Sequence, residues 1–403
     1  MGSGAGGARW AAGRSHPIPA ILWPAHAVVR QSVTMSSWTV LTASVPEDLD
    51  SPDAWALHGV ARVTYAIEMS TWGYPDLMHP AGHLLAELRE QRYSIRRLMV
   101  AVPEVTNAPT ADDVVGMAKV TLPLKDNTHL MYLELCIEPG HTRRGLGSAL
   151  MAAAEQIAAE HERTTVIAWS EHAGEPAADV PDVLEPPTGS GRINPDDAGG
   201  RFALHHGYVL EQAERYSVLR LPVEESLQAR LHAEAAAKAG PDYRLVAWRD
   251  RTPDEWVDQV ALLETRMSTD APSAGLDMVE STWDADRVRT WEKAVAEGNH
   301  GYLLVAAEHV PTGTLAAFTV VRFPVEHPEV AFQDDTLVLQ EHRGRRLGML
   351  VKSDALRRLR EVRPDAARIH TWNAEENTHM LSINVTLGFT PTGVIGMWQK
   401  RLG

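Results

Sequence analysis

Hydrophobic residues recur along the chain with two different periods in different stretches. Short stretches with every second residue apolar predict half-buried strands, and longer stretches with an apolar stripe every 3.6 residues predict amphipathic helices. Residues 347–362 show the helical case, with Leu347, Leu350 and Val351 on one face. In the first half the pattern predicts strands over residues 40–43, 98–102, 114–122, 130–137 and 165–170, helices over 54–69, 84–91, 147–161 and 202–206, and terminal strands within 208–221.

The same succession returns in the second half. It predicts strands over residues 243–248, 302–307, 315–323, 330–338 and 369–372, helices before residue 297 and over 347–362 and 376–386, and a final pair of strands within 389–399. Landmarks recur at a constant spacing: Glu134 and Asp335 are 201 residues apart, and so are Gly147 and Gly348. A fixed period of this kind indicates two copies of one domain.

The 403 residues are enough for two or three domains of about 150 residues each. We predict an α/β protein of the mixed α+β kind, with an N-terminal domain over residues 37–223 and a C-terminal domain over 243–403. A linker over 224–242 joins them, and its Ala-rich part favours a helix. Residues 1–36 are interpreted as a disordered extension or as the product of an upstream start codon.

Composition narrows the possible functions. The formal net charge of −15 provides no basic footprint for nucleic acid. No apolar run approaches the roughly 20 residues that span a bilayer. Cys136 is the only cysteine, so an intrachain disulfide is impossible. We expect a cytoplasmic monomer or homodimer that binds neither nucleic acid nor membrane, with an acidic surface that mildly favours cationic small molecules.

A Gly-rich turn follows the predicted strand over residues 130–137 and precedes a predicted helix. Its sequence is Glu138-Pro139-Gly140-His141-Thr142-Arg143-Arg144-Gly145-Leu146-Gly147-Ser148. N–H groups at a helix N-terminus point outward, and glycines let a phosphate approach the main chain, so the turn predicts an anion cradle. It matches neither a Walker A loop nor a dinucleotide fingerprint. The arginines suit phosphate, although a solvated basic turn has the same sequence.

This turn resembles the coenzyme motif of the GNAT superfamily of acyl-CoA N-acyltransferases. The family pattern is Arg/Gln-x-x-Gly-x-Gly/Ala after a strand that ends in Val-x-Pro. Residues 142–147 match it except at Thr142, and residues 343–348 match it except at Arg346. The resemblance covers nearly all of residues 37–403. It is to the tandem, two-domain type common in actinobacteria, of which mycothiol synthase is a distant example.

The resemblance implies two GNAT domains, each a twisted and mostly antiparallel sheet that splays at the coenzyme site and is flanked by helices. It also implies acetyl-CoA as co-substrate, and no metal. The coenzyme-binding residues implied in the first copy are Cys136, Ile137, Thr142, Arg143, Arg144, Gly145, Leu146, Gly147 and Ser148. Those implied in the second copy are Val338, Arg343, Gly344, Arg345, Arg346, Leu347, Gly348, Asn373, Asn377 and Asn384. Each copy departs once from the pattern, so the sequence leaves open which copy is active.

Two matched carboxylates are the candidate catalytic residues. Glu134 and Asp335 stand in otherwise apolar strands, where a carboxylate without a partner would be costly. Each is interpreted either as a base or amine-binding group for acetyl transfer, or as a carboxylate paired with an arginine or facing solvent. The tyrosine that serves as acid in much of the family is replaced by Ala203 and Asn384. Cys136 is expected to be a buried small side chain rather than a nucleophile.

The amine acceptor is expected to contact the first helices of each copy, through Glu68, Trp72 and Asp270. Acidic and aromatic side chains together bind an ammonium, although a solvated acidic face is an equal alternative. We predict an N-acetyltransferase that moves acetyl from acetyl-CoA to a small-molecule primary amine by direct attack in a ternary complex. The alternatives are a non-catalytic acyl-CoA-binding sensor or scaffold, and a protein lysine acetyltransferase.

Overall fold

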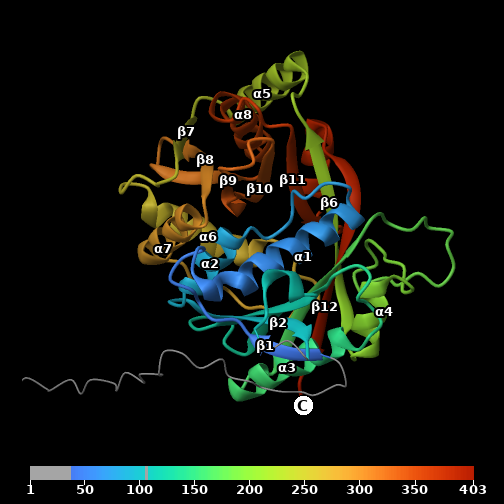
Figure 1. Cartoon of the computed structure of the whole chain (residues 1–403). Helices are drawn as coiled ribbons and strands as arrows, with labels where there is room; N and C mark the ends of the chain where they lie inside the picture. The colour runs from blue at the N-terminus through green and yellow to red at the C-terminus, as the bar shows by residue number, and fades with distance from the viewer. Residues whose placement is uncertain (1–37, 105–107) are drawn as a thin grey trace, which may run out of the picture.

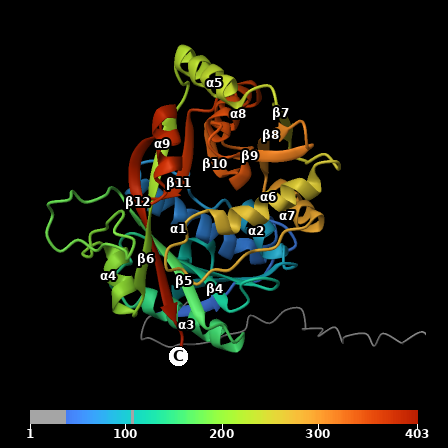
Figure 2. The same ribbon diagram turned by 180° about the vertical axis from the view of Figure 1, so that it is seen from behind.

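The computed structural model describes residues 38–104 and 108–403. The predicted extension over residues 1–36 lies outside this range. One continuous sheet runs through the described chain, with helices on both of its faces (Figures 1 and 2). The first half supplies strands β1 (Trp38–Thr42), β2 (Ser94–Pro103), β3 (Gly116–Pro123), β4 (Leu130–Ile137), β5 (Thr165–His172) and β6 (Val209–Arg220), and helices α1 (Trp55–Thr71), α2 (Ala81–Arg89), α3 (Leu146–Glu160) and α4 (Ala198–His205).

The second half repeats this succession after helix α5. Its helices are α5 (Glu225–Ala239), α6 (Val257–Asp270), α7 (Ala285–Glu297), α8 (Leu347–Val362) and α9 (Thr378–Leu387). Its strands are β7 (Tyr243–Arg249), β8 (His300–His309), β9 (Thr314–Pro324), β10 (Val330–Val338), β11 (Arg368–Ala374) and β12 (Thr390–Arg401). The Ala-rich part of the predicted linker therefore forms α5. The prediction of a mixed α/β fold with a mostly antiparallel sheet is confirmed.

Alternating apolar side chains of the strands build a core on each face of the sheet. On β2, Met99 and Ala101 face α3, whereas Leu98, Val100 and Val102 face α1 and α2. In the second half, α5 and α8 cover one face, and α6 and α7 cover the other. The period of two along each strand thus places both faces in contact with helices.

The two halves exchange their last strands. The sheet order is β1-β2-β3-β4-β5-β12-β6-β11-β10-β9-β8-β7, so β12 of the second half lies between β5 and β6 of the first. Likewise, β6 pairs with β11 along its length. The predicted terminal strand pairs were wrong, because each half ends in one long strand of 12 residues. That strand finds neighbours on both sides in the shared sheet, which satisfies its main-chain N–H and C=O groups.

In each half, the loop between the first two helices contacts the other half. In the loop between α1 and α2, Asp76 accepts hydrogen bonds from Arg368 (2.9 Å) and His370 (2.9 Å) of β11. In the loop between α6 and α7, the main-chain oxygen of Val279 accepts a hydrogen bond from Asn127 (2.9 Å). The two halves are therefore joined by polar contacts as well as by the sheet.

The sheet opens where the coenzyme motif was predicted. Strands β4 and β5 pair in parallel only from Leu130 to Leu133 on β4, although β4 continues to Ile137. Strands β10 and β11 pair in parallel only from Val330 to Phe332. The unpaired ends of these strands diverge, and each divergence leaves a gap that side chains line.

Candidate active site

The first Gly-rich turn forms a basic groove at the start of α3. Gly145 precedes the helix with a left-handed backbone (φ 81°), and Arg143 is left-handed too (φ 63°). Arg143 and Arg144 are exposed, and neither forms an ion pair with another residue in the described part of the chain. The groove is lined by His141, Thr142, Arg143, Gly145, Leu146, Gly147, Ser148, Arg201, Phe202 and His205. Free N–H groups and unpaired cations together suit a phosphate.

The second turn has the same backbone but different electrostatics. Arg346 (φ 58°) precedes α8 where Gly145 precedes α3, and Gly344 (φ 78°) corresponds to Arg143. The two turns therefore share two left-handed positions: the first turn has arginine and then glycine there, and the second has glycine and then arginine. Its groove is lined by Val338, Arg343, Gly344, Arg346, Leu347 and Gly348, among others.

Two arginines of this second turn form ion pairs with acidic side chains. Arg343 Nη2 lies 2.7 Å from Asp270 Oδ2, and Arg346 Nη1 lies 3.2 Å from Glu234 Oε2. The Arg345 guanidinium lies over the Tyr243 ring, 5.6 Å from its centre. Asp270, which was expected to contact the acceptor, lines the second groove, and its contact with an acceptor stays a prediction. A phosphate entering there would meet a carboxylate, so the first groove is the better anion site.

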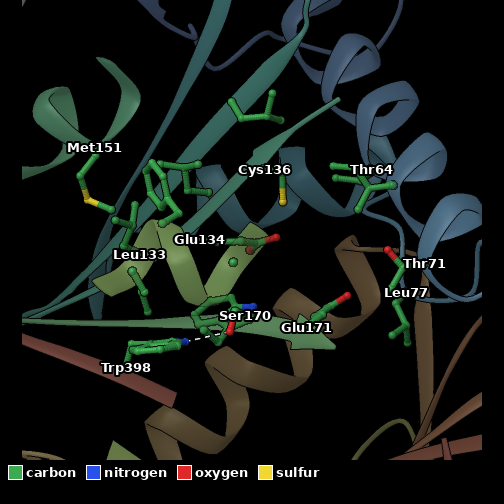
Figure 3. A pocket seen from close by; sticks show the side chains of 18 of the residues that line it. Thr64, Thr71, Leu77, Leu133, Glu134, Cys136, Met151, Ser170, Glu171 and Trp398 are labelled. Atoms are coloured by element: carbon green, nitrogen blue, oxygen red, sulfur yellow. Dashed lines mark hydrogen bonds between the residues drawn. The ribbon is translucent and has the colours of Figure 1, made fainter. Parts of the chain in front are cut away.

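The first groove continues into a cavity of about 260 Å³ between β4 and β5 (Figure 3). Leu135, Ile137, Gly199 and Phe202 line both the groove and the cavity. Beyond them the cavity holds polar side chains, which Figure 3 shows converging from α1, β4 and β5. A long ligand anchored in the groove therefore reaches these side chains between the diverging strands.

Glu134 is buried at the end of this cavity between two basic groups. Its Oε2 lies 3.2 Å from Lys119 Nζ of β3, and its Oε1 contacts His79 Nε2. Lys119 also pairs with Glu87 of α2, at 2.9 Å. Burial raises the pKa of Glu134, but the charges of His79 and Lys119 outweigh it and hold this pKa well below its usual value. Glu134 is therefore a permanent carboxylate that fixes one side of the His79 ring.

Burial raises the pKa values of other acidic groups near Glu134. Burial raises the pKa of Glu68 to about 9, and the nearby charges of Glu171 and Glu134 raise it further. Burial also raises the pKa of Glu171, whose carboxylate accepts a hydrogen bond from Trp72 Nε1 (3.2 Å). Burial raises the pKa of Cys136 well above its usual value, so the thiol stays protonated. Glu68 lines the first cavity, and Trp72 contacts its lining residue Glu171; contact of either with an acceptor stays a prediction.

A second cavity lies between the two halves and joins the first. Leu77, His79, Glu134, Trp169 and Glu171 line both cavities. The far wall of the second cavity comes from the C-terminal half and includes His300, Arg322, Phe332 and Trp372. Glu214 of β6 lines the same cavity from the N-terminal half, and burial raises its pKa to about 7. The space between the halves is therefore both acidic and aromatic.

Asp335 lies in a corresponding gap of the C-terminal half. Burial raises its pKa to about 6, and the charge of Asp334 adds to the shift. Burial and Asp335 together raise the pKa of the neighbouring Glu264 well above its usual value. Lys352 faces the same gap and, at the repeat spacing, replaces Met151 of the first half. Burial lowers the pKa of Lys352 to about 7.

The three predicted asparagines of the second half serve local structure. Asn377 caps α9 by accepting a hydrogen bond from the main-chain N–H of Met380 (3.2 Å). Asn384 Nδ2 donates to Asn373 Oδ1 (2.6 Å). Asn377 lines the second groove, and Asn373 lines the gap around Asp335. Their contact with a coenzyme remains a prediction.

Several site residues were not found by sequence analysis. His79 and Lys119 reach Glu134 from a loop and from another strand, so no local pattern marks them. Ser170 and His172 lie two apart on β5, which places them on one face. This spacing was a usable signal, but their partner Asp197 is 25 residues further on. Tyr208 also lines the first cavity, and its hydroxyl contacts Met151 Sδ at 3.3 Å.

Comparisons with known proteins agree with this geometry. Residues 64–180 match the model of the acetyltransferase (GNAT) family. This match runs from within α1 to just past β5 and includes the first Gly-rich turn and Glu134. This part of the chain is therefore similar to the GNAT acetyltransferases. No curated protein matches the sequence significantly.

Solved structures extend the GNAT likeness over both halves. A tandem GNAT protein from the clavulanic acid biosynthesis pathway aligns with a TM-score of 0.65 at 23% identity, covering 91% of this chain and 99% of that one. A GCN5-related N-acetyltransferase from Sphaerobacter thermophilus aligns with a TM-score of 0.53 at 14% identity, covering 91% and 96%. The Saccharomyces cerevisiae N-myristoyltransferase, solved with myristoyl-CoA, aligns with a TM-score of 0.52 at 10% identity, covering 93% and 81%. The fold is thus that of tandem GNAT proteins.

Two other kinds of feature are absent from residues 38–104 and 108–403. No group of three or more His, Cys, Asp or Glu side chains is placed to hold a metal ion. None of the helices described there is both long and apolar enough to cross a membrane.

Proposed function

We propose that this tandem GNAT protein is an N-acetyltransferase whose N-terminal half binds acetyl-CoA and whose acceptor is a small primary amine. The observation that carries the proposal is the continuous path from the first groove, past Leu135 and Ile137, to Glu134 and His79. Arg143 and the N–H groups at the start of α3 hold the coenzyme phosphates. The pantetheine arm follows the gap between β4 and β5, which brings the thioester to the polar end of the cavity.

The acceptor occupies the cavity between the two halves. A bound ammonium group lowers the pKa of both Glu171 and Glu214, which burial raises, and their negative charges hold it in the cavity. Trp169 and Trp372 add aromatic faces that favour the same charge. On this proposal the C-terminal half contributes the acceptor wall, while its own phosphate groove carries no turnover.

His79 serves as the base in the proposed reaction. The amine must lose a proton before or while it attacks the thioester carbon. The Glu134 carboxylate holds His79 Nε2 and stabilises the imidazolium that forms, which leaves Nδ1 to take the proton. Glu134 is a weak base itself, because Lys119 and His79 already stabilise its charge. It therefore positions the base rather than taking the proton.

Calorimetric titration of acetyl-CoA and a turnover assay test the proposal together. We expect one binding site per chain, and release of free CoA thiol with at least one amine from a set of diamines, amino sugars and amino acids. Glu134→Gln should lower turnover and leave the acetyl-CoA affinity unchanged. Absence of binding refutes the proposal, and binding without turnover supports the sensor alternative. Loss of turnover in Asp335→Asn instead would place the reaction in the C-terminal half.

A further inference from the structure

Ser170 lies in the first cavity within a chain of hydrogen bonds that ends at the protein surface. Its Oγ is 2.7 Å from His172 Nε2, and His172 Nδ1 is 2.8 Å from Asp197 Oδ2. The His172 side chain is 1% exposed, whereas that of Asp197 is 42% exposed. A hydroxyl, an imidazole oriented by a carboxylate, and a link to solvent form a pathway along which a proton can move.

A second donor fixes the direction of the Ser170 hydroxyl. Trp398 Nε1 of β12 donates to Ser170 Oγ at 2.8 Å, as Figure 3 shows. When His172 Nε2 also carries a proton, Oγ accepts two hydrogen bonds, and its own hydrogen is free for a third partner. That partner must lie in the cavity, because Ser170 is one of its lining residues.

Neighbouring glycines provide the space for this arrangement. A Cβ at Gly199 would lie 2.7 Å from the Cβ of Ser170, and a Cβ at Gly396 would lie 3.0 Å from its Oγ. Larger residues at either position would displace the hydroxyl from His172. The serine is thus closely enclosed by α4 and β12.

Among the described residues, the hydrogen-bonded series Ser170–His172–Asp197 is found only in the N-terminal half, whose groove has arginines without acidic partners. Parallel pairing relates Thr165 to Leu130 in the first half and Ile369 to Ala331 in the second. Counting along the strands from these pairs, Ser170 corresponds to Ala374, and His172 to Glu376. The second half therefore has neither the hydroxyl nor the imidazole.

We propose that Ser170, His172 and Asp197 form a proton relay that protonates the departing thiolate of CoA. This inference rests on the proposed acetyl transfer, which otherwise lacks an acid because Ala203 stands at the usual tyrosine position. The amine nitrogen forms a bond to the acetyl carbon, and the carbon–sulfur bond breaks. Sulfur takes the hydroxyl proton of Ser170, and His172 Nε2 returns a proton to Oγ. His79 releases the amine proton to water, and His172, left neutral with its remaining proton on Nδ1 toward Asp197, regains a proton at Nε2 from water that enters the cavity after CoA leaves.

Steady-state kinetics of relay variants test this proposal. The probes are acetyl-CoA and the amine from the set above that gives the fastest turnover with the wild-type protein. Ser170→Ala and His172→Gln should each lower kcat about 100-fold, while the KM for acetyl-CoA stays within about twofold. Because the groups act as one unit, the double variant should be no slower than either single variant. Ser353→Ala is the matched control, since it removes a partly buried Ser–His hydrogen bond (3.1 Å, to His232) outside the cavities.

Other outcomes overturn the relay. A kcat in Ser170→Ala equal to that of the Ser353→Ala control refutes it, as do additive losses in the double variant. A large loss in Tyr208→Phe with none in Ser170→Ala assigns the acid to Tyr208. An acetyl group found on Ser170 by mass spectrometry makes it a nucleophile instead. If the wild-type protein turns over no amine, the proposed function fails first, and the relay fails with it.

Discussion

Glu68 gives a quantitative test of the electrostatics in the first cavity. Its side chain on α1 is buried, and its Oε2 finds no hydrogen-bond partner among the described residues. Burial, followed by the charges of Glu171 and Glu134, raises its pKa to about 9. The variant Glu68→Gln keeps the shape of the neutral acid and removes the titration.

The sign of the effect follows from proton linkage. The folded pKa of about 9 lies above the ordinary value of 4.5, so the folded protein holds the proton that the unfolded chain has lost. The associated stability is fully present below pH 4.5 and is lost as the pH rises toward 9. The greatest slope is about 1.4 kcal/mol per pH unit, so the wild-type protein should lose about 2–3 kcal/mol relative to the variant between pH 6 and pH 8.

Urea unfolding at pH 6, 7 and 8 measures this difference. Glu225→Gln is the control, because the Glu225 side chain is 85% exposed on α5 and should show no such pH dependence relative to wild type. If Glu68→Gln and the wild-type protein keep a constant difference in unfolding free energy over this range, Glu68 is ionised in the folded protein. The account of Glu68 as a neutral acid in the cavity would then be wrong.

Three further variants test the remaining contacts. Arg143→Gln should weaken acetyl-CoA binding about tenfold in calorimetry, through loss of a charged hydrogen bond; unchanged affinity would show that the coenzyme does not use the first groove. Lys119→Met should lower the unfolding free energy by about 3–5 kcal/mol, because Glu134 loses a buried cation; a loss below about 1 kcal/mol in urea titration would contradict this. Asp76→Ala should cost a similar amount, since two basic partners on β11 lose their carboxylate, and an unchanged melting temperature would count against that contact.

Local sequence patterns were enough to place most helices and strands. The stripe along α8 and the alternation along β2 each depend on neighbours a few residues apart, and those neighbours determine which face is buried. The left-handed turn before α3 was marked by its glycines. The repeat spacing held in the structure too, since Gly145 and Arg346 occupy the same backbone conformation.

Features that depend on distant pairing were not predictable in this way. Nothing in the alternation of residues 208–221 or 389–399 distinguishes a hairpin from two long strands that pair across the halves. The environment of Glu134 depends on Lys119 and His79, which come from separate elements. Glu134 was therefore recognised as unusual, but its fixed charge and its role beside an imidazole required the three-dimensional arrangement.

Because β12 is the last strand to be translated, the N-terminal half stays incomplete until the end of synthesis. Trp398, which lines the first cavity and holds Ser170, is translated after every other strand of the sheet. A nascent chain that has left the ribosome only as far as β6 exposes the open edges of β5 and β6, which invite pairing with other chains. The N-terminal half, although made first, therefore completes its reaction cavity last. Prematurely terminated chains should accordingly be inactive, and they should depend on chaperones to remain unaggregated.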